Sequence, residues 1–171
     1  MQNITGEELL AQYQQGKRDF RGVILQYTSL DIAKLEGVDF TGAIFNNVSL
    51  QLTFINCNFF CSEWWFCRIP KFMGCNMQYA VFEGCYFSGI SVDSDWKNSQ
   101  TMSPYHDEFI YERCDLRGMR KSSGGIYLGP EDYCTPGFGV LYKNTFDEDG
   151  FFHSGICCTF TLRDPNDDIP F

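Results

Sequence analysis

The chain has 171 residues and a formal net charge of -9, with an isoelectric point near 4.6. The length allows one domain with a real core, and the acidic balance argues against non-specific binding to nucleic acid or to an anionic membrane surface. No apolar run of about 18 residues and no basic segment leading into an apolar one occurs, so we expect neither a transmembrane helix nor a secretory signal. Nine cysteines then fit a reducing compartment, and we expect a cytoplasmic protein.

Residues 1–17 are expected to form a helical cap. Thr5 suits the N-cap position, Glu8 three residues later completes a capping box, and Ile4 can pack on Leu9. Gly16 is expected to end the helix. Because a helix of about ten residues is marginal alone in water, it must rest its apolar side on the segment that follows.

Residues 18–92 carry a large apolar residue at every fifth position, and usually a small residue two places before it. The centres are Phe20, Leu25, Leu30, Leu35, Phe40, Phe45 and Leu50, then Phe54, Phe59, Trp64 and Ile69, then Phe72, Met77, Phe82, Phe87 and Val92. The register slips near residues 50–54 and again near 69–72. A period of five fits neither a helix nor a half-buried strand. Units that run straight briefly and then turn can close a four-sided coil, and coils stack about 4.8 Å apart.

Four units a coil predict about four coils and four columns of stacked centres. The columns are Phe20, Phe40, Phe59 and Met77; Leu25, Phe45, Trp64 and Phe82; Leu30, Leu50, Ile69 and Phe87; and Leu35, Phe54, Phe72 and Val92. The helical cap is expected to cover the open edge of the first coil.

The units VDFTG, AIFNN, CNFFC, CNMQY and CDLRG resemble the repeats of the pentapeptide-repeat family. The resemblance covers residues 18–92, with an outlying unit at 114–118. It implies an all-β solenoid, a right-handed quadrilateral β-helix. It also implies a non-enzymatic scaffold or regulatory protein–protein interaction module of bacterial origin, since many family members come from cyanobacteria.

The family also includes proteins that protect DNA gyrase from quinolones and are thought to resemble duplex DNA. The alternative function is therefore a DNA-mimicking modulator of DNA gyrase or topoisomerase. Those members dimerise by their C-terminal ends. The resemblance therefore also suggests a homodimer, formed either at that end or through an aromatic coil. Residues 17–92 carry six acidic and six basic residues. A DNA mimic needs negative charge spread along the rod, so the balance favours a protein partner, with no direct nucleic acid and no membrane.

Residues 93–171 are expected to form a partly irregular C-terminal section. The stretch 91–108 is polar and reads as a loop. One or two further repeats, centred on Tyr111 and Leu116, are expected at about 109–118. Beyond them, apolar residues recur every five positions from Leu141 to Ile156 without the small residues, and short hairpins closing the far end are an equal alternative.

The cysteines are expected to be structural core residues. In the predicted coil Cys57 lies over Cys75 and Cys67 lies over Cys85. A separation near 4.8 Å is within reach of a disulfide. However, cysteine also fills the small inward position as a small hydrophobe, which is the interpretation we favour.

Metal and catalytic patterns are weak. His153 stands near Cys157 and Cys158, but a zinc site wants four ligands with paired spacing, and no CxxC occurs. His106, followed by two acidic residues, has no recognised ligand spacing, and no third group orients a Cys–His pair. The sequence predicts no enzyme, no catalytic or metal-binding residue and no cofactor.

A candidate partner or dimer contact lies on the third coil. The two positions after each centre are expected to point outward, and there they include Phe60, Trp65 and Phe66. The other coils carry mostly polar residues at the matching positions. Exposed aromatic groups of this kind mark contacts. The alternatives are that the C-terminal section folds over them or that the slips turn these side chains elsewhere.

Overall fold

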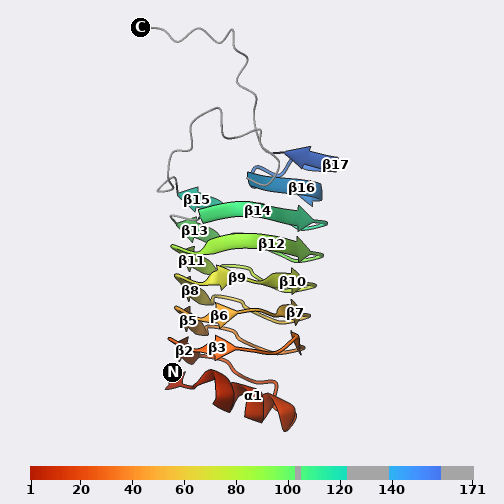
Figure 1. Ribbon diagram of the computed structural model, residues 1–171. Helices are drawn as coiled ribbons and strands as arrows, with labels where there is room; N and C mark the ends of the chain where they lie inside the picture. Colours follow the sequence, from red (N-terminus) through yellow and green to blue (C-terminus); the bar gives the residue numbers. More distant parts are fainter. Residues whose placement is uncertain (103–104, 123–138, 159–171) are drawn as a thin grey trace, which may run out of the picture.

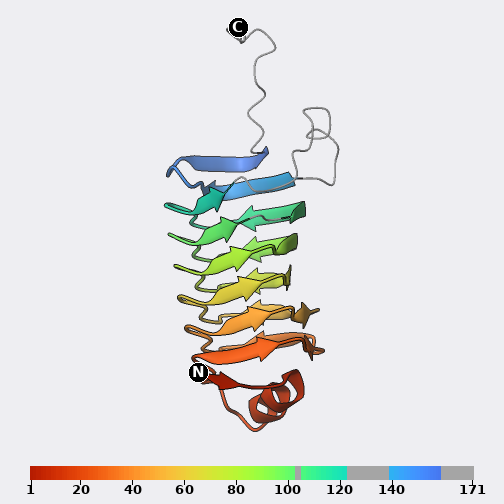
Figure 2. The ribbon, with the colours of Figure 1, turned by 90° about the vertical axis from the view of Figure 1, so that its left-hand side faces the viewer.

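The structure is a computed structural model that describes residues 1–102, 105–122 and 139–158. Stacked coils form a rod, and a single helix closes the N-terminal end (Figures 1 and 2). The arrangement is a right-handed quadrilateral β-helix, so the predicted fold is confirmed. No helix in the described part is long and apolar enough to span a membrane.

The N-terminal cap forms as predicted. Helix α1 (Gly6–Gln14) begins after Thr5, whose hydroxyl accepts a hydrogen bond from Glu8 N, while Thr5 N donates to the Glu8 carboxylate at 2.9 Å. Leu9 is fully buried against the first coil. Strand β1 (Gln2–Asn3) adds a feature that the sequence pattern did not indicate, because it pairs with the first coil and covers its edge.

The first face of the rod is a ladder of single bridges. It runs through Asp19, Asp39, Asn58, Asn76, Asp95 and Asp115, and ends at Phe146. These six polar residues each begin one coil, so the rod has six coils, and the prediction of about four is corrected. The steps between them are twenty, nineteen, eighteen, nineteen and twenty residues. The third coil, residues 58–75, is therefore the shortest.

The second face is a parallel sheet in the order β1-β2-β5-β8-β11-β13-β15. Its strands after β1 are β2 (Val23–Gln26), β5 (Ile44–Asn46), β8 (Glu63–Trp65), β11 (Val81–Glu83), β13 (Gln100–Met102) and β15 (Arg120–Ser122). Side chains alternate along these strands, so the middle residues of β5, β8, β11 and β13 are buried.

The third face holds short strands and the fourth face a longer ladder. The third comprises β3 (Ser29–Leu30), β6 (Ser49–Leu50) and β9 (Arg68–Ile69). The fourth comprises β4 (Lys34–Glu36), β7 (Thr53–Ile55), β10 (Lys71–Met73) and β16 (Gly139–Phe146). Strands β12 (Tyr86–Val92) and β14 (Tyr105–Glu112) bend across both faces. Antiparallel β17 (Phe152–Cys158) closes the C-terminal end against β16, which confirms the hairpin alternative.

The predicted columns are confirmed except at one position. In the first column the ring of Phe40 stacks on Phe20 at 5.9 Å and on Phe59 at 5.3 Å. In the fourth column, however, Phe72 pairs with Ser91, while Val92 pairs with Met73 and is half-buried. The reason is a corner one residue shorter than the period of five, between Phe87 and Ser91.

The prediction that 91–108 is a loop is wrong where the structure describes it. Ser91 and Thr101 occupy inward positions and are almost fully buried, as is Trp96 between them. Trp96 N donates to Asp115 O at 2.8 Å, so the coil continues upward. Tyr111 and Leu116 are buried centres as predicted, but Tyr142, rather than Leu141, stands over Tyr111.

Candidate functional site

An aromatic band crosses the second face on the third coil. Phe60 is 36% and Phe66 58% exposed, while Trp65 is half-buried and its indole N–H donates to the Glu63 carboxylate at 3.3 Å. Tyr79 from the next coil, 49% exposed, packs edge-on against Phe60 with ring centroids 5.5 Å apart. We call Phe60, Trp65, Phe66 and Tyr79 the aromatic band. Sequence reasoning missed Tyr79, although it stands two positions after a centre, as Phe66 does.

The backbone of Phe66 is in the left-handed region, with φ 52°. The same corner holds Asn47 one coil below and Gly84 one coil above, both residue types that tolerate this conformation. A bulky aromatic residue in that region costs roughly 1 kcal/mol or more. The Phe66 ring lies over Gly84, where an added Cβ would come within 2.6 Å of it. Asn and Gly suit this conformation best, although Tyr27 also adopts it at the same corner two coils below.

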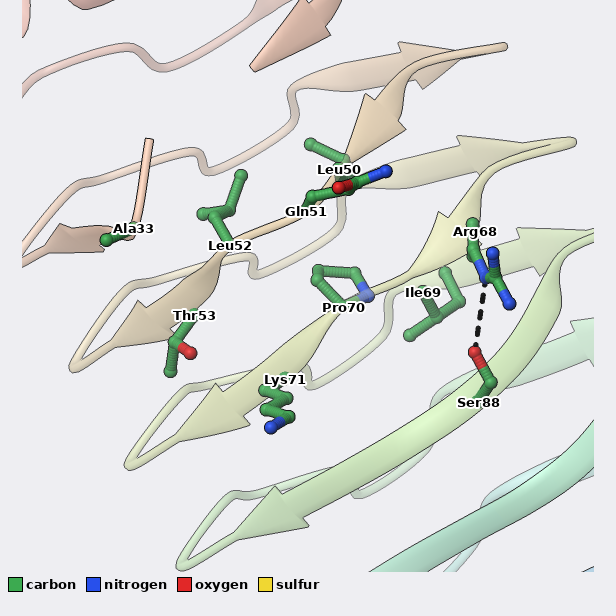
Figure 3. A pocket seen from close by; sticks show the side chains of 10 residues that line it. All are labelled: Ala33, Leu50, Gln51, Leu52, Thr53, Arg68, Ile69, Pro70, Lys71 and Ser88. Carbon is green, nitrogen blue, oxygen red and sulfur yellow. Dashed lines mark hydrogen bonds between the residues drawn. The ribbon is translucent and has the colours of Figure 1, made fainter. Parts of the chain in front are cut away.

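A corner groove lies between the third and fourth faces. From coil to coil the step between inward residues at this corner is five, four, three and four residues. The pairs are Leu30 to Leu35, Leu50 to Phe54, Ile69 to Phe72, and Phe87 to Ser91. Both register slips therefore shorten the same corner. The hollow left there has a volume of about 460 Å³ and is lined by Ala33, Leu50, Gln51, Leu52, Thr53, Arg68, Ile69, Pro70, Lys71 and Ser88 (Figure 3).

The backbone ladder of the third face is interrupted at this groove. Strand β3 pairs with β6, and β9 pairs with β12, but no ladder joins β6 to β9 in the described part of the chain. Pro70, which follows β9 directly, brings no N–H group. Between β6 and β9, therefore, no strand pairing links the second coil to the third in the described residues.

The corner groove has an apolar floor and a cationic rim. Ile69 and Leu50 are almost fully buried. Arg68 and Lys71 are exposed, and neither forms an ion pair among the residues described. Arg68 Nε donates to Ser88 Oγ at 3.3 Å, and its guanidinium lies over the Tyr86 ring at 5.2 Å. Sequence reasoning located the slips but could not assign them to one corner, so it missed this site.

The acidic residues of the first face are paired rather than free. At each coil the Asp or Asn side chain accepts a hydrogen bond from the backbone N–H two residues on, as between Asp39 and Thr41 at 3.0 Å. Arg21 bonds Asp19 and lowers the pKa of that carboxyl to about 2. Lys97 lies 3.0 Å from Asp95. Carboxylates along this column are therefore matched by neighbouring cations.

A repeated coil that combines Asx turns, small inward residues and apolar centres invites comparison with known families. The family model described as "Pentapeptide repeats (8 copies)" matches residues 19–51. Residues 19–51 therefore match the pentapeptide-repeat family. The match ends where the first shortened corner begins, although the coil itself continues beyond it. No curated protein matches the chain.

Two solved structures are similar in part. One is QnrB1, a plasmid-mediated fluoroquinolone resistance protein, with 14% identity over 88% of this chain and 81% of that chain, and a TM-score of 0.34. The other is HetL from the cyanobacterium Nostoc, a pentapeptide-repeat protein involved in heterocyst differentiation regulation. It has 12% identity over 88% of this chain and all of that chain, and a TM-score of 0.23. Likeness this low says nothing of what the present protein binds.

Five of the described cysteines occupy the small inward positions. Cys57, Cys67, Cys75, Cys85 and Cys114 are buried free thiols. Each donates to backbone carbonyls, as Cys57 Sγ does to Leu35 O at 3.5 Å and to Ile55 O at 3.4 Å. Ser94 fills the same position one coil above Cys75, where its hydroxyl donates to Val92 O at 2.9 Å and accepts from Cys75 N at 3.1 Å. These contacts support a structural role for the thiols.

The thiols are predicted to differ sharply in reactivity. Burial raises the pKa of Cys85 to about 12 and that of Cys114 to about 11, whereas Cys61 is exposed at a corner. Because the thiolate is the reactive form, we expect iodoacetamide at pH 8 to label Cys61 at least tenfold faster than Cys67, Cys85 or Cys114. Peptide mass spectrometry of the native protein measures the rates. Equal labelling of Cys61 and Cys85 would contradict the burial described here.

The other residues considered from the sequence do not assemble a site. Among the residues that the structure describes, no three His, Cys, Asp or Glu side chains gather to hold a metal ion. His153 instead bonds the Asp147 carboxylate at 2.7 Å, in the turn between β16 and β17. The side chains of His106, Cys157 and Cys158, and a covering role for residues 159–171, lie outside what is described.

Proposed function

We propose that this protein is a non-enzymatic cytoplasmic scaffold that holds another protein against the aromatic band. The observation that carries the proposal is Phe66, which is 58% exposed and left-handed and belongs to the aromatic band, whereas the exposed Tyr27 at the same corner lies outside that band. An aromatic residue that costs stability and gains little burial is typical of a functional position.

The rigidity of the coil supports this proposal. Phe60 and Phe66 extend from corners of a coil whose backbone is bonded to the coils on both sides. Side chains held on such a framework lose little conformational freedom when a partner binds. Aromatic anchors of this kind dominate the energetics of protein interfaces.

The charge distribution supports a protein partner over mimicry of DNA. The carboxylates of Asp19, Asp95 and Asp115 all lie within ion-pair distance of Arg or Lys. A duplex presents one unpaired negative charge for about every 1.7 Å of its axis. A column of neutralised carboxylates does not reproduce that field.

The test is to replace Phe66 by the residue found one coil below it. We expect Phe66→Asn to leave the free energy of unfolding unchanged or to raise it by up to about 1 kcal/mol, because the strain at φ 52° is relieved. We expect the same variant to capture at least tenfold less partner than the wild type from an extract of the cells that naturally make the protein. Urea denaturation and quantitative mass spectrometry give the two measurements.

Tyr27→Asn is the matched control. Tyr27 is 75% exposed at the same corner, also left-handed with φ 49°, but two coils away from the band. The Tyr27→Asn variant should still capture the partner, whereas the Trp65→Ala variant should not. Light scattering on each variant shows whether the partner is a second copy of the chain. Capture by Phe66→Asn and Trp65→Ala equal to that by the wild type would overturn the proposal.

A further inference from the structure

We propose that the corner groove binds an extended acidic segment of the partner protein. This inference rests on the proposed function, because it supplies the chemistry of the partner that the aromatic band holds. The groove lies on the same coil as the band: Arg68 follows Phe66 by two residues, and Lys71 lies directly beyond Pro70 (Figure 3).

The cations of the groove are available to a ligand. Most other basic residues of the rod are occupied, as Arg21 is by Asp19, Lys34 by Glu36 and Arg113 by Asp93. Arg68 and Lys71 form no such pair in the described residues. Arg68 is instead held by Ser88 and by the Tyr86 ring, contacts that orient the guanidinium without neutralising it. A carboxylate at the rim would gain charge-assisted hydrogen bonds from Arg68, and a second carboxylate from Lys71.

The groove also suits a main chain. Its volume of about 460 Å³ lies in the range of binding pockets and leaves room for only a short segment. Leu50, Leu52 and Ile69 close its floor and expose only a small apolar surface there. The strand pairing of the third face is missing between β6 and β9, and the proposed extended segment would lie across this gap.

The surroundings favour a peptide over a nucleic acid. An adjoining hollow of about 230 Å³ is lined in part by Asp31. The cationic surface is therefore followed by an acidic residue on that side. Single-stranded nucleic acid requires a basic track with exposed aromatic platforms along it. Here two cations stand over an aliphatic floor. The groove therefore matches a segment with acidic and apolar side chains.

The experiment uses a random heptapeptide phage library as its probe. The library is selected in parallel on the wild type, on the double variant Arg68→Gln/Lys71→Gln and on Lys34→Gln, all checked for folding by circular dichroism. Lys34 is a matched control because it lies on the fourth face two coils below Lys71, in an ion pair with Glu36. Peptides enriched on the wild type are synthesised, labelled and titrated by fluorescence polarisation.

We expect the enriched peptides to carry at least two acidic residues with apolar neighbours. They should bind the double variant at least tenfold more weakly, bind Lys34→Gln unchanged, and weaken as salt rises. Enriched peptides without acidic residues, or equal binding to the double variant, would overturn the inference. So would labelled oligothymidylate that binds the wild type in place of the peptides and loses affinity in the double variant.

The two proposals fail separately. Phe66→Asn should leave peptide binding at the groove intact while it loses partner capture. If acidic peptides fail but partner capture still depends on Phe66, the groove inference is wrong and the scaffold proposal stands. If peptides bind through Arg68 and Lys71 but Phe66→Asn captures as much partner as the wild type, the inference about the groove is supported. In that case the aromatic band is not the partner site.

Discussion

Replacing Trp64 by Ala is expected to lower the free energy of unfolding by about 3–5 kcal/mol, the range for deleting a large buried aromatic side chain. Trp64 is fully buried and stacks on Phe45 at 4.1 Å and on Phe82 at 5.6 Å between ring centroids. Its indole N–H also donates to Ser62 Oγ at 2.8 Å, so the variant leaves a buried hydroxyl without its donor. Urea denaturation followed by far-ultraviolet circular dichroism measures the loss.

Trp65→Ala is the control, because it removes the same side chain one position along β8. Trp65 is half-buried on the outer surface, and its indole N–H donates to the Glu63 carboxylate. Its cost should stay within about 1 kcal/mol, as for most surface substitutions. Similar losses in the two variants would contradict the alternation of inward and outward residues on which the coil depends.

Replacing Gly6 by Ala is expected to destabilise the protein by about 2–4 kcal/mol, although Ala is the better helix former. An added Cβ at Gly6 would overlap Ser29 O and lie 2.9 Å from Thr28 Oγ1. Gly6 N also donates to that Thr28 hydroxyl at 3.0 Å. Overpacking and the loss of this bond together outweigh the gain in helix propensity.

Glu7→Ala provides the matched control, because Glu7 is exposed in the same turn of α1. It should change the free energy of unfolding by less than about 1 kcal/mol. Hydrogen exchange should show earlier opening of residues 2–14 in Gly6→Ala and not in Glu7→Ala. A Gly6→Ala variant more stable than the wild type would mean that α1 does not rest on the first coil.

Periodicity was enough to predict the fold because one residue in each unit faces inward. The rings of Phe20, Phe40 and Phe59 lie in one stack as expected, and the capping box at Thr5 forms. The prediction stopped too early because Ser91 and Thr101 fill inward positions with small polar side chains. Large neighbours such as Trp96 fill the interior there. The repeat of an apolar residue at every fifth position is therefore lost from the sequence, although the coil continues.

The candidate site was predictable only in part. Phe60, Trp65 and Phe66 stood out because polar residues replace them on other coils. The contribution of Tyr79 depends on a contact across coils, and the corner groove depends on two deletions that fall at the same corner. Linear spacing shows that a residue is missing but does not say which side of the rod has lost it. Only the paired registers of Leu50 with Phe54 and of Ile69 with Phe72 locate it.

The stepwise shortening of one corner has a practical consequence for engineering. The columns of inward residues on both sides of the corner stay stacked, while the connection between them loses one residue in the second coil and two in the third. The length of this connection can therefore change without disturbing the core. Inserting two residues after Pro70 should fill the recess without moving Ile69 or Phe72. The depth of the recess is therefore an adjustable parameter, and other ligand shapes could be accommodated on an unchanged framework.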